Sequence, residues 1–395
     1  MYRIKLNKYL KLSIRYLKLG IGTLIVGILS YMLISPSMKR FKGPDQYCIY
    51  IVSNYDDKTS VIIRDAFEEK IKKMNLEIDG VKIKVERRND QGDLSKAKAC
   101  ALGIAKKNDV LMVVGHFYSD TTKEALPIYL DADPQIPVIL TTETNPQLLP
   151  PLSKEYQPIY CLSPDDNNQA DVAAKLATRE EEDVNFWVVQ DDQVRVYSNF
   201  LANKFIEKVQ GITNKKVLLL SSSNLTPSVE TLRALDIDCV FFAGLWHSAL
   251  ILIDQINEIY ENDPNKPKII LTDACVDPRL IPRGKDAVEG VYLIHQLKAN
   301  VYRQEGRGWG YYGDEAAATI RKIIDEANST FKKSSIRKWL DIHRVSDARK
   351  SIKEAMENIH GEKRRVDTSF NIWKIKKDGK EDGMNVYKFS DWEEE

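Results

Sequence analysis

The sequence has no excess of charge of either sign. Its 395 residues include 58 Lys and Arg side chains against 57 Asp and Glu side chains, which gives a formal net charge of +1. Proteins that bind nucleic acid usually carry a clear basic excess, so this balance argues against a nucleic-acid partner. The chain is longer than a usual single core and 43% of its residues are hydrophobic, which predicts two lobes plus appendages.

Cysteine is scarce and shows no metal-binding pattern. The five cysteines are Cys48, Cys100, Cys161, Cys239 and Cys275, and none of them forms a CxxC pair. A zinc site needs tightly spaced ligands, so we expect no metal and no cofactor. Cys48, Cys161 and Cys239 lie in apolar, strand-like runs, where cysteine is usually a small buried hydrophobe.

Sequence signatures of several enzyme classes are also missing. No G-x-S-x-G, H-E-x-x-H, P-loop or strand-linked G-x-G-x-x-G motif occurs, and the five histidines include no pair at ligand spacing. A Ser/His/Asp assembly from distant positions stays open, with His116 near Ser119 as the nearest candidate. We expect a protein without catalytic activity and keep a hydrolase as the distant alternative.

The N-terminus has the pattern of a membrane anchor. Residues 1–18 hold six basic and no acidic side chains, and residues 19–38 carry no charge. An uncharged apolar span of roughly 20 residues can cross a bilayer as a helix. A cleaved signal peptide is the alternative, but its apolar core is usually shorter, ~7–15 residues. Because the basic cluster precedes the span, we expect a cytoplasmic N-terminus and a periplasmic or extracellular main domain.

Two series of alternating strands and helices follow the anchor. Short apolar runs bounded by turn residues are typical of buried parallel strands, and alternation with helices indicates a sheet with crossovers. The first series has strands at 47–52, 81–85 and 110–114, with helices around 61–71 and 97–105; the second has strands at 184–189, 217–220, 239–242 and 269–271, with helices at 197–209 and 248–259. The repeated pattern predicts two similar lobes.

The stretch from Asp109 to Leu149 indicates a ligand site. A strand ends at Gly115, and a polar loop leads into a helix for which Ser119 is the expected N-cap. A second strand, Pro137 to Leu140, opens into a loop rich in threonine. Because parallel strands place their carboxyl ends at one edge of a sheet, both polar loops should meet there. Hydroxyl groups and free N–H groups at a helix start together suit a carboxylate.

This stretch resembles the type 1 periplasmic solute-binding proteins, specifically the leucine/isoleucine/valine-binding family of ABC transporter substrate-binding proteins. The resemblance lies in these pieces, in chain order: Gly115 to Ser119, Pro127-Ile128-Tyr129, Ile136 to Ile139, Thr142 to Thr144, and Asn145-Pro146-Gln147-Leu148. It extends from Tyr47 to about Phe389. Some members carry paired cysteines near the Ser loop, where this chain has Tyr118, so we expect no structural disulfide.

The resemblance implies an α/β fold of two doubly wound parallel-sheet lobes joined by a hinge, preceded by one transmembrane helix. The expected division is a basic terminus at 1–18, an anchor at 19–38, a first lobe of 45–161 plus 275–345, a second lobe of 162–274 plus 346–389, and an acidic tail at 390–395. Within this division, 369–375 and 386–389 should form a closing hairpin.

The resemblance also implies the residues that bind the ligand. Ser119 matches the serine that holds a ligand carboxylate. Thr142 and Thr144 match the loop positions that supply a carbonyl oxygen to the ammonium and a hydroxyl to the carboxylate. Tyr197 matches an aromatic residue of the second lobe that closes over the ligand. For each of these residues, capping, turn formation or helix packing is the structural alternative.

This chain departs from the family pattern where an acid usually pairs with the ligand ammonium. Ser248 stands at that position, and Trp246 close to it could offer a stacking face. Glu143 and Asp273 are the two acids that could replace the missing carboxylate. We therefore expect a membrane-anchored protein that captures an amino acid or a derivative for an ABC-type importer. The alternative is a sensor ectodomain whose closure a signalling partner reads.

Overall fold

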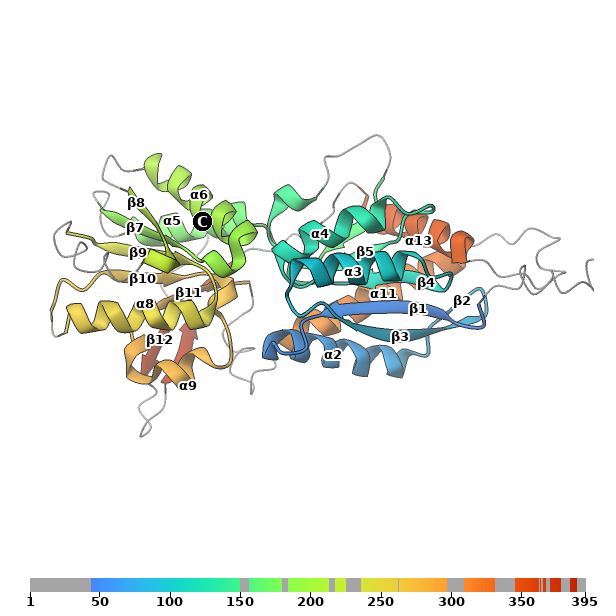
Figure 1. Ribbon diagram of the computed structural model, residues 1–395, viewed down its shortest axis with the longest axis horizontal. Coiled ribbons are helices and arrows are strands. Elements are labelled where there is room, and N and C mark those ends of the chain that lie inside the picture. The colour runs from blue at the N-terminus through green and yellow to red at the C-terminus, as the bar shows by residue number, and fades with distance from the viewer. Residues whose placement is uncertain are drawn as a thin grey trace, which may run out of the picture.

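The computed structural model describes residues 44–149, 156–179, 184–212, 217–224, 236–261, 263–296, 309–330, 345–361, 363, 365–366, 370–377 and 384–388 (Figure 1). The predicted basic terminus, anchor and acidic tail lie outside these residues. Among the described helices, none is both long enough and apolar enough to span a bilayer. The described chain forms two α/β lobes, seen side by side in Figure 1.

The first lobe is built on a six-stranded sheet in the order β2-β3-β1-β4-β5-β6. Apart from the short antiparallel β2, all its strands run parallel, and Ile49 of β1 pairs with Val85 of β3. Its elements are β1 (Tyr47–Ser53), α2 (Lys58–Met74), β2 (Glu77–Ile78), β3 (Val81–Asn89), α3 (Leu94–Ala105), β4 (Val110–Val114), α4 (Ser119–Leu130), β5 (Val138–Leu140), β6 (Ile159–Cys161), α11 (Gly310–Thr330) and α13 (Val345–His360).

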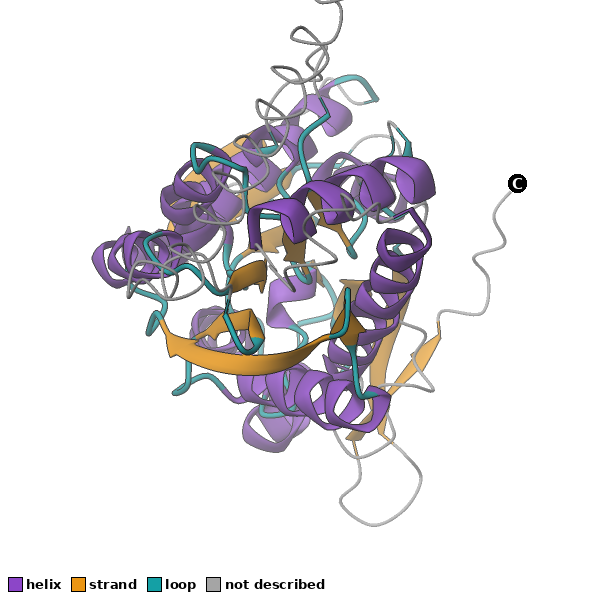
Figure 2. Cartoon of the chain, turned by 90° about the vertical axis from the view of Figure 1, so that its right-hand side faces the viewer, coloured by secondary structure: helices purple, strands orange, loops and turns teal. Residues whose placement is uncertain are grey.

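Helices cover both faces of this sheet, as the end-on view in Figure 2 shows. Alternate residues of β1 supply the two faces, because successive side chains of a strand point to opposite sides. Ile49 and Ile51 pack with α2, α11 and α13 in one core, whereas Tyr50 and Val52 pack with α3 and α4 in another. Every residue of β1 and β4 is buried, as expected for a parallel strand covered on both sides.

The second lobe has a seven-stranded sheet in the order β13-β12-β11-β10-β9-β7-β8. Strands β7 to β11 run parallel to one another. Strands β12 and β13 form an antiparallel hairpin at the edge of the sheet, which confirms the predicted closing hairpin. Its elements are α5 (Asp166–Ala177), β7 (Phe186–Gln190), α6 (Arg195–Gln210), β8 (Val217–Ser221), β9 (Cys239–Ala243), α8 (Trp246–Ile259), β10 (Lys268–Leu271), α9 (Leu280–Gly284), β11 (Tyr292–His295), β12 (Asn371–Lys377) and β13 (Met384–Lys388).

The predicted division of the chain between the lobes is wrong at two places after residue 275. Strand β11 pairs parallel with β10 and antiparallel with β12, so residues up to His295 belong to the second lobe rather than the first. Helix α13, predicted for the second lobe, packs on α11 of the first, and Arg349 Nε donates to the carbonyl oxygen of Val110 at 2.7 Å. The reason is burial: α11 and α13 cover the apolar face of β1 and β4.

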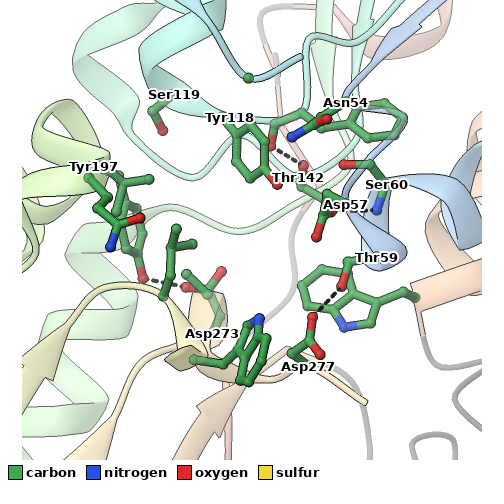
Figure 3. A pocket seen from close by; sticks show the side chains of 18 of the residues that line it. Asn54, Asp57, Thr59, Ser60, Tyr118, Ser119, Thr142, Tyr197, Asp273 and Asp277 are labelled. Carbon is green, nitrogen blue, oxygen red and sulfur yellow. Dashed lines mark hydrogen bonds between the residues drawn. The ribbon is translucent and has the colours of Figure 1, made fainter. Parts of the chain in front are cut away.

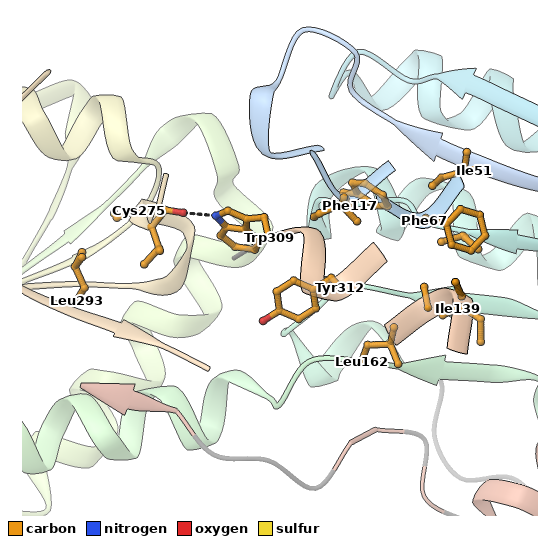
Figure 4. Close-up of a cluster of buried hydrophobic side chains, with 14 of the residues drawn as sticks. Ile51, Phe67, Phe117, Ile139, Leu162, Cys275, Leu293, Trp309 and Tyr312 are labelled. Carbon is orange, nitrogen blue, oxygen red and sulfur yellow. Dashed lines mark hydrogen bonds between the residues drawn. The ribbon is translucent and has the colours of Figure 1, made fainter. Parts of the chain in front are cut away.

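The chain therefore crosses between the lobes after β6, after β11 and after α13. At the first crossing, the backbone of residues 161–166 is held by Arg365. Its Nη1 donates to the carbonyl oxygens of Ser163 at 2.8 Å and Pro164 at 3.1 Å. The lobes also share a buried contact, because Trp309, just before α11, donates from Nε1 to the carbonyl oxygen of Val276 (Figure 4).

The strand orders determine where a ligand can bind. In each sheet the connections reverse direction between two adjacent strands, β1 and β4 in the first lobe and β7 and β9 in the second. A crevice opens at the carboxyl ends of such strands, and open α/β sheets bind ligands there. The loops that follow these four strands face one another across the gap between the lobes.

Candidate functional site

A cavity of about 410 Å³ lies between the lobes, in the size range of small-molecule sites. Its walls come from the loops after β1, β4 and β5 of the first lobe and after β7, β9 and β10 of the second. Six residues predicted to bind ligand line it: Ser119, Thr142, Thr144, Tyr197, Trp246 and Asp273. The other two, Glu143 and Ser248, do not line it.

The loop before α4 brings Ser119 to the cavity. Gly115 has φ +112°, and a Cβ there would lie 2.3 Å from the carbonyl oxygen of Val52, so only glycine allows β4 to turn here. Ser119 is the first residue of α4 rather than its N-cap, which corrects the prediction; the cap is Tyr118, which makes no side-chain capping bond. The Ser119 hydroxyl is instead directed to Glu143, since the loop after β5 places that carboxylate within 2.9 Å.

Glu143 lies behind Ser119, in the wall of the first lobe. It is 1% exposed, and its Oε1 also accepts from the backbone N–H of Asn145 at 2.7 Å. Burial raises the pKa of Glu143 to about 7, although the hydrogen bonds from Ser119 and Asn145 favour its ionised form. The position suits a group that orients Ser119 and does not suit direct contact with a ligand.

The two threonines lie in the loop after β5, as predicted. The Thr142 hydroxyl donates to the carbonyl oxygen of Phe117 at 2.8 Å, which ties this loop to the one after β4. The carbonyl oxygen of Thr144 accepts from the backbone N–H of Asp166 at 2.9 Å, at the first crossing between the lobes. Both side chains border the cavity, so one loop serves both the site and the crossing.

Tyr197 and Asp273 form the facing wall, contributed by the second lobe. The Tyr197 hydroxyl, on α6, donates to Asp273 Oδ1 at 2.6 Å (Figure 3). Asp273 follows β10 and is 6% exposed, and burial raises the pKa of its carboxyl group. Asp166 lies behind it, fully buried, and burial together with the nearby Asp273 raises the pKa of Asp166 well above its ordinary value.

The loop after β9 holds the position at which the resemblance implies a ligand-binding acid. Gly244 passes so close to Asp191 that an added Cβ would lie 2.3 Å from the Asp191 Cβ. The Asp191 carboxylate accepts from the backbone N–H of Leu245 at 2.9 Å, which fixes the loop. Trp246 borders the cavity, whereas Ser248 points to Gln193, whose Nε2 donates to its hydroxyl at 3.3 Å.

A set of polar residues that no sequence pattern had singled out joins the two lobes. Arg279 Nη2 donates to Asp57 Oδ1 at 3.2 Å across the cavity, and the Thr59 hydroxyl donates to Asp277 Oδ2 at 3.1 Å. Elsewhere on the rim, Asp120 Oδ1 accepts from the backbone N–H of Val196 at 3.3 Å. A signal existed for Asp57, because its loop follows β1 at the same carboxyl edge as Ser119.

The hydrolase alternative finds no support in the contacts of His116. Its Nδ1 lies 2.6 Å from Asp90 Oδ2 and its Nε2 lies 3.2 Å from the Tyr129 hydroxyl, all three side chains being buried. Ser119 is bonded to Glu143 instead. His116 therefore holds the loop after β4 in place and does not activate Ser119. The five cysteines, all within the described residues, are free thiols.

Comparison with known proteins places the chain among solute-binding proteins. A sequence-family model for periplasmic binding proteins matches residues 60–309. An amino acid binding protein from Pseudomonas aeruginosa is 25% identical over 293 residues, which cover 68% of this chain and 74% of that protein.

Solved structures share the fold at low sequence identity. A leucine-binding protein from Thermotoga maritima superposes with a TM-score of 0.66 at 15% identity, covering 88% of this chain and all of that one. A solute-binding protein from Rhodopseudomonas palustris in complex with 3,4-dihydroxybenzoic acid gives a TM-score of 0.64 at 14% identity, covering 87% and 96%. A branched-chain amino acid transporter substrate-binding protein from Streptococcus pneumoniae, in complex with isoleucine, gives 0.62 at 13% identity, covering 87% and 99%.

Proposed function

The chain belongs to the periplasmic binding protein family, and on that premise we propose that it captures an amino acid or a close derivative between its lobes. Its family makes it a binding protein and not an enzyme. One observation carries the proposal: Ser119 of the first lobe and Asp273 of the second border the same cavity. They can take the two ends of a zwitterion.

The carboxylate end of the ligand fits the start of α4. The first N–H groups of a helix have no partner within the helix, and the helix dipole favours a negative charge there. Thr144 adds a hydroxyl group beside these N–H groups, whereas the Ser119 hydroxyl donates to Glu143, so Ser119 offers its backbone N–H. Thr142 has its hydroxyl bound to Phe117, so we assign it to holding the loop and leave its carbonyl oxygen for the ammonium.

The ammonium end fits Asp273, with the Tyr197 hydroxyl already fixed against that carboxylate. A buried ammonium without an anionic partner is costly, and Ser248 cannot supply the charge. Asp273 replaces the missing acid better than Glu143, because Asp273 borders the cavity and Glu143 lies behind Ser119. Trp246 borders the same cavity.

Closure of the lobes over the ligand would exclude water, and the three crossings between the lobes provide the hinge. We propose delivery of the bound solute to an ABC-type importer outside the cytoplasm, with 19–38 as a membrane anchor. The basic cluster followed by an uncharged span favours a second output, a tethered sensor read by a partner, because a tethered carrier does not gain from diffusion. A reporter that works only in the cytoplasm can be fused after Glu395. Activity of this reporter would contradict the proposed topology.

Thermal shift against an amino-acid panel tests the proposal, since a ligand that binds only the native state raises its stability. Losing a hydrogen bond to a charged group costs ~1.5–3 kcal/mol, so Asp273→Asn should weaken binding roughly 10–100-fold, and Ser119→Ala less. Asp254→Asn, at an exposed position on α8, is the matched control. If neither Asp273→Asn nor Glu143→Gln changes affinity, the ligand has no ammonium group and the amino-acid proposal fails.

A further inference from the structure

The cavity wall carries more carboxylates than one ammonium group requires. Five aspartates border it: Asp56, Asp57, Asp120, Asp273 and Asp277. Against them, the described part of the wall presents one guanidinium group, that of Arg279. A cavity lined by one sign of charge raises the local concentration of solutes of the opposite sign.

Arg279 does not balance this excess, because its charge is already matched by one partner. Its Nε and Nη2 donate to the two carboxylate oxygens of Asp277, each at 2.7 Å, in a bidentate pair. Asp57 is a second carboxylate on the same guanidinium, at 3.2 Å. The guanidinium carbon also lies 4.7 Å from the centre of the Trp246 ring, which covers one face of the group.

Two further carboxylates lie at the end of the cavity where Ser119 is. Asp120 directly follows Ser119 in α4, and its Oδ2 is buried with no hydrogen-bond partner among the described residues. Asp273 stands opposite, on the second lobe. A negative charge on Asp120 next to Ser119 disfavours any additional carboxylate of the ligand at this end of the cavity.

The cavity has two polar ends with an aromatic side chain between them. Figure 3 shows Ser119, Tyr197 and Asp273 toward one end and Asp57 with Thr59 toward the other. Tyr118 projects between these ends, and a ring face there can receive the alkyl stem or the cationic head of a basic solute.

We infer that the cleft selects a solute with a second positive charge, a basic amino acid or a related diamine, whose distal cation pairs with Asp57 while its α-ammonium pairs with Asp273. The inference rests on the proposed function, since it concerns the same cavity and assigns the solute class. It sets this chain apart from the Rhodopseudomonas palustris protein that holds 3,4-dihydroxybenzoic acid, whose ligand is an anion.

Calorimetric titration of the full chain with four matched solutes tests the inference. L-lysine, L-norleucine and L-2-aminoadipate share a backbone but end in an ammonium, a methyl and a carboxylate group; cadaverine has two ammonium groups and no carboxylate. We expect L-lysine to bind at least about tenfold more tightly than L-norleucine, as one hydrogen-bonded charge allows. L-2-aminoadipate should show no binding, and added salt should weaken L-lysine binding more than L-norleucine binding.

A variant assigns the preference to its residue. Asp57→Asn should reduce the ratio of L-lysine to L-norleucine affinity, Ser119→Ala should lower both affinities in parallel, and the exposed control Asp254→Asn should leave the ratio unchanged. Binding of L-norleucine or L-2-aminoadipate as tight as that of L-lysine would overturn the charge preference and leave the amino-acid function standing. Binding of cadaverine alone would support the preference and overturn the carboxylate seat at Ser119. If none of the four binds, the inference is wrong, and the thermal-shift panel of amino acids decides the proposed function separately.

Discussion

Glu143 gives the sharpest link between burial and a measurable property. Its carboxyl group has an ordinary pKa of 4.5 in the unfolded chain, and burial raises that pKa to about 7 in the fold. Between these two values the unfolded chain has released the proton while the folded chain keeps it, so the free energy of unfolding falls as pH rises. The pKa difference corresponds to about 3 kcal/mol of stability, fully present below pH 4.5 and lost by about pH 7.

Glu143→Gln should remove this share of the pH dependence. A glutamine oxygen can still accept from Ser119 and Asn145, so the variant keeps both contacts while losing the titration. Urea unfolding at pH 5 and pH 7.5 measures the difference for each protein. The wild-type chain should lose more stability over this range than the variant, by up to about 3 kcal/mol. Glu261→Gln makes the same chemical change at an exposed position. If wild type and Glu143→Gln lose stability in parallel, Glu143 does not hold its proton in the fold.

Two other substitutions test contacts between elements. Arg279→Gln removes a half-buried ion pair with Asp57 between the lobes, worth about 1 kcal/mol. The ratio of closed to open ligand-free molecules, measured by spin-label distances between the lobes, should therefore fall about fivefold. Arg321→Gln is the control and should not change this ratio, because its partner Asp325 lies on the same helix. Gly313→Ala would place a Cβ 2.1 Å from the carbonyl oxygen of Ile63 on α2 and should destabilise the chain by ~1–3 kcal/mol in urea unfolding. At Gly103 an added Cβ would meet no other atom within 4 Å, so Gly103→Ala should instead stabilise α3 by ~0.5–1 kcal/mol. Equal changes in stability for Gly313→Ala and Gly103→Ala would contradict the close packing of α11 on α2.

Strands that are buried on both faces could be predicted from the sequence, whereas some helices could not. The run Val110–Val114 is uniformly apolar because helices cover both sides of β4. Helix α5 gave no comparable signal, because its buried face consists largely of alanines, which give little hydrophobic contrast. Helix α13 did carry a signal, with Ala348, Ile352, Ala355 and Met356 at helical spacing, but its lobe depends on tertiary packing.

Site residues that lie just after a strand end could be predicted from the sequence. Whether a given side chain points into the cavity could not. Asp273 could be placed at the cavity because it lies two residues after the end of β10. The rule that placed Ser119 could have found Asp57 as well, since both loops end strands at one sheet edge. No sequence rule tells that Glu143 turns inward to Ser119, or that Ser248 turns to Gln193, because both outcomes depend on the positions of loops from distant parts of the chain.

The distance between the lobes with and without bound amino acid is the most direct test of a hinged solute-binding protein. Spin labels on α3 and α8 report it in the full chain, with Cys100→Ser removing the one native thiol that is not buried. Saturating amino acid should shift the distance distribution to a single shorter population, and Asp273→Asn should require more ligand for the same shift. An unchanged distribution under conditions where calorimetry shows binding would contradict closure of the lobes over the ligand.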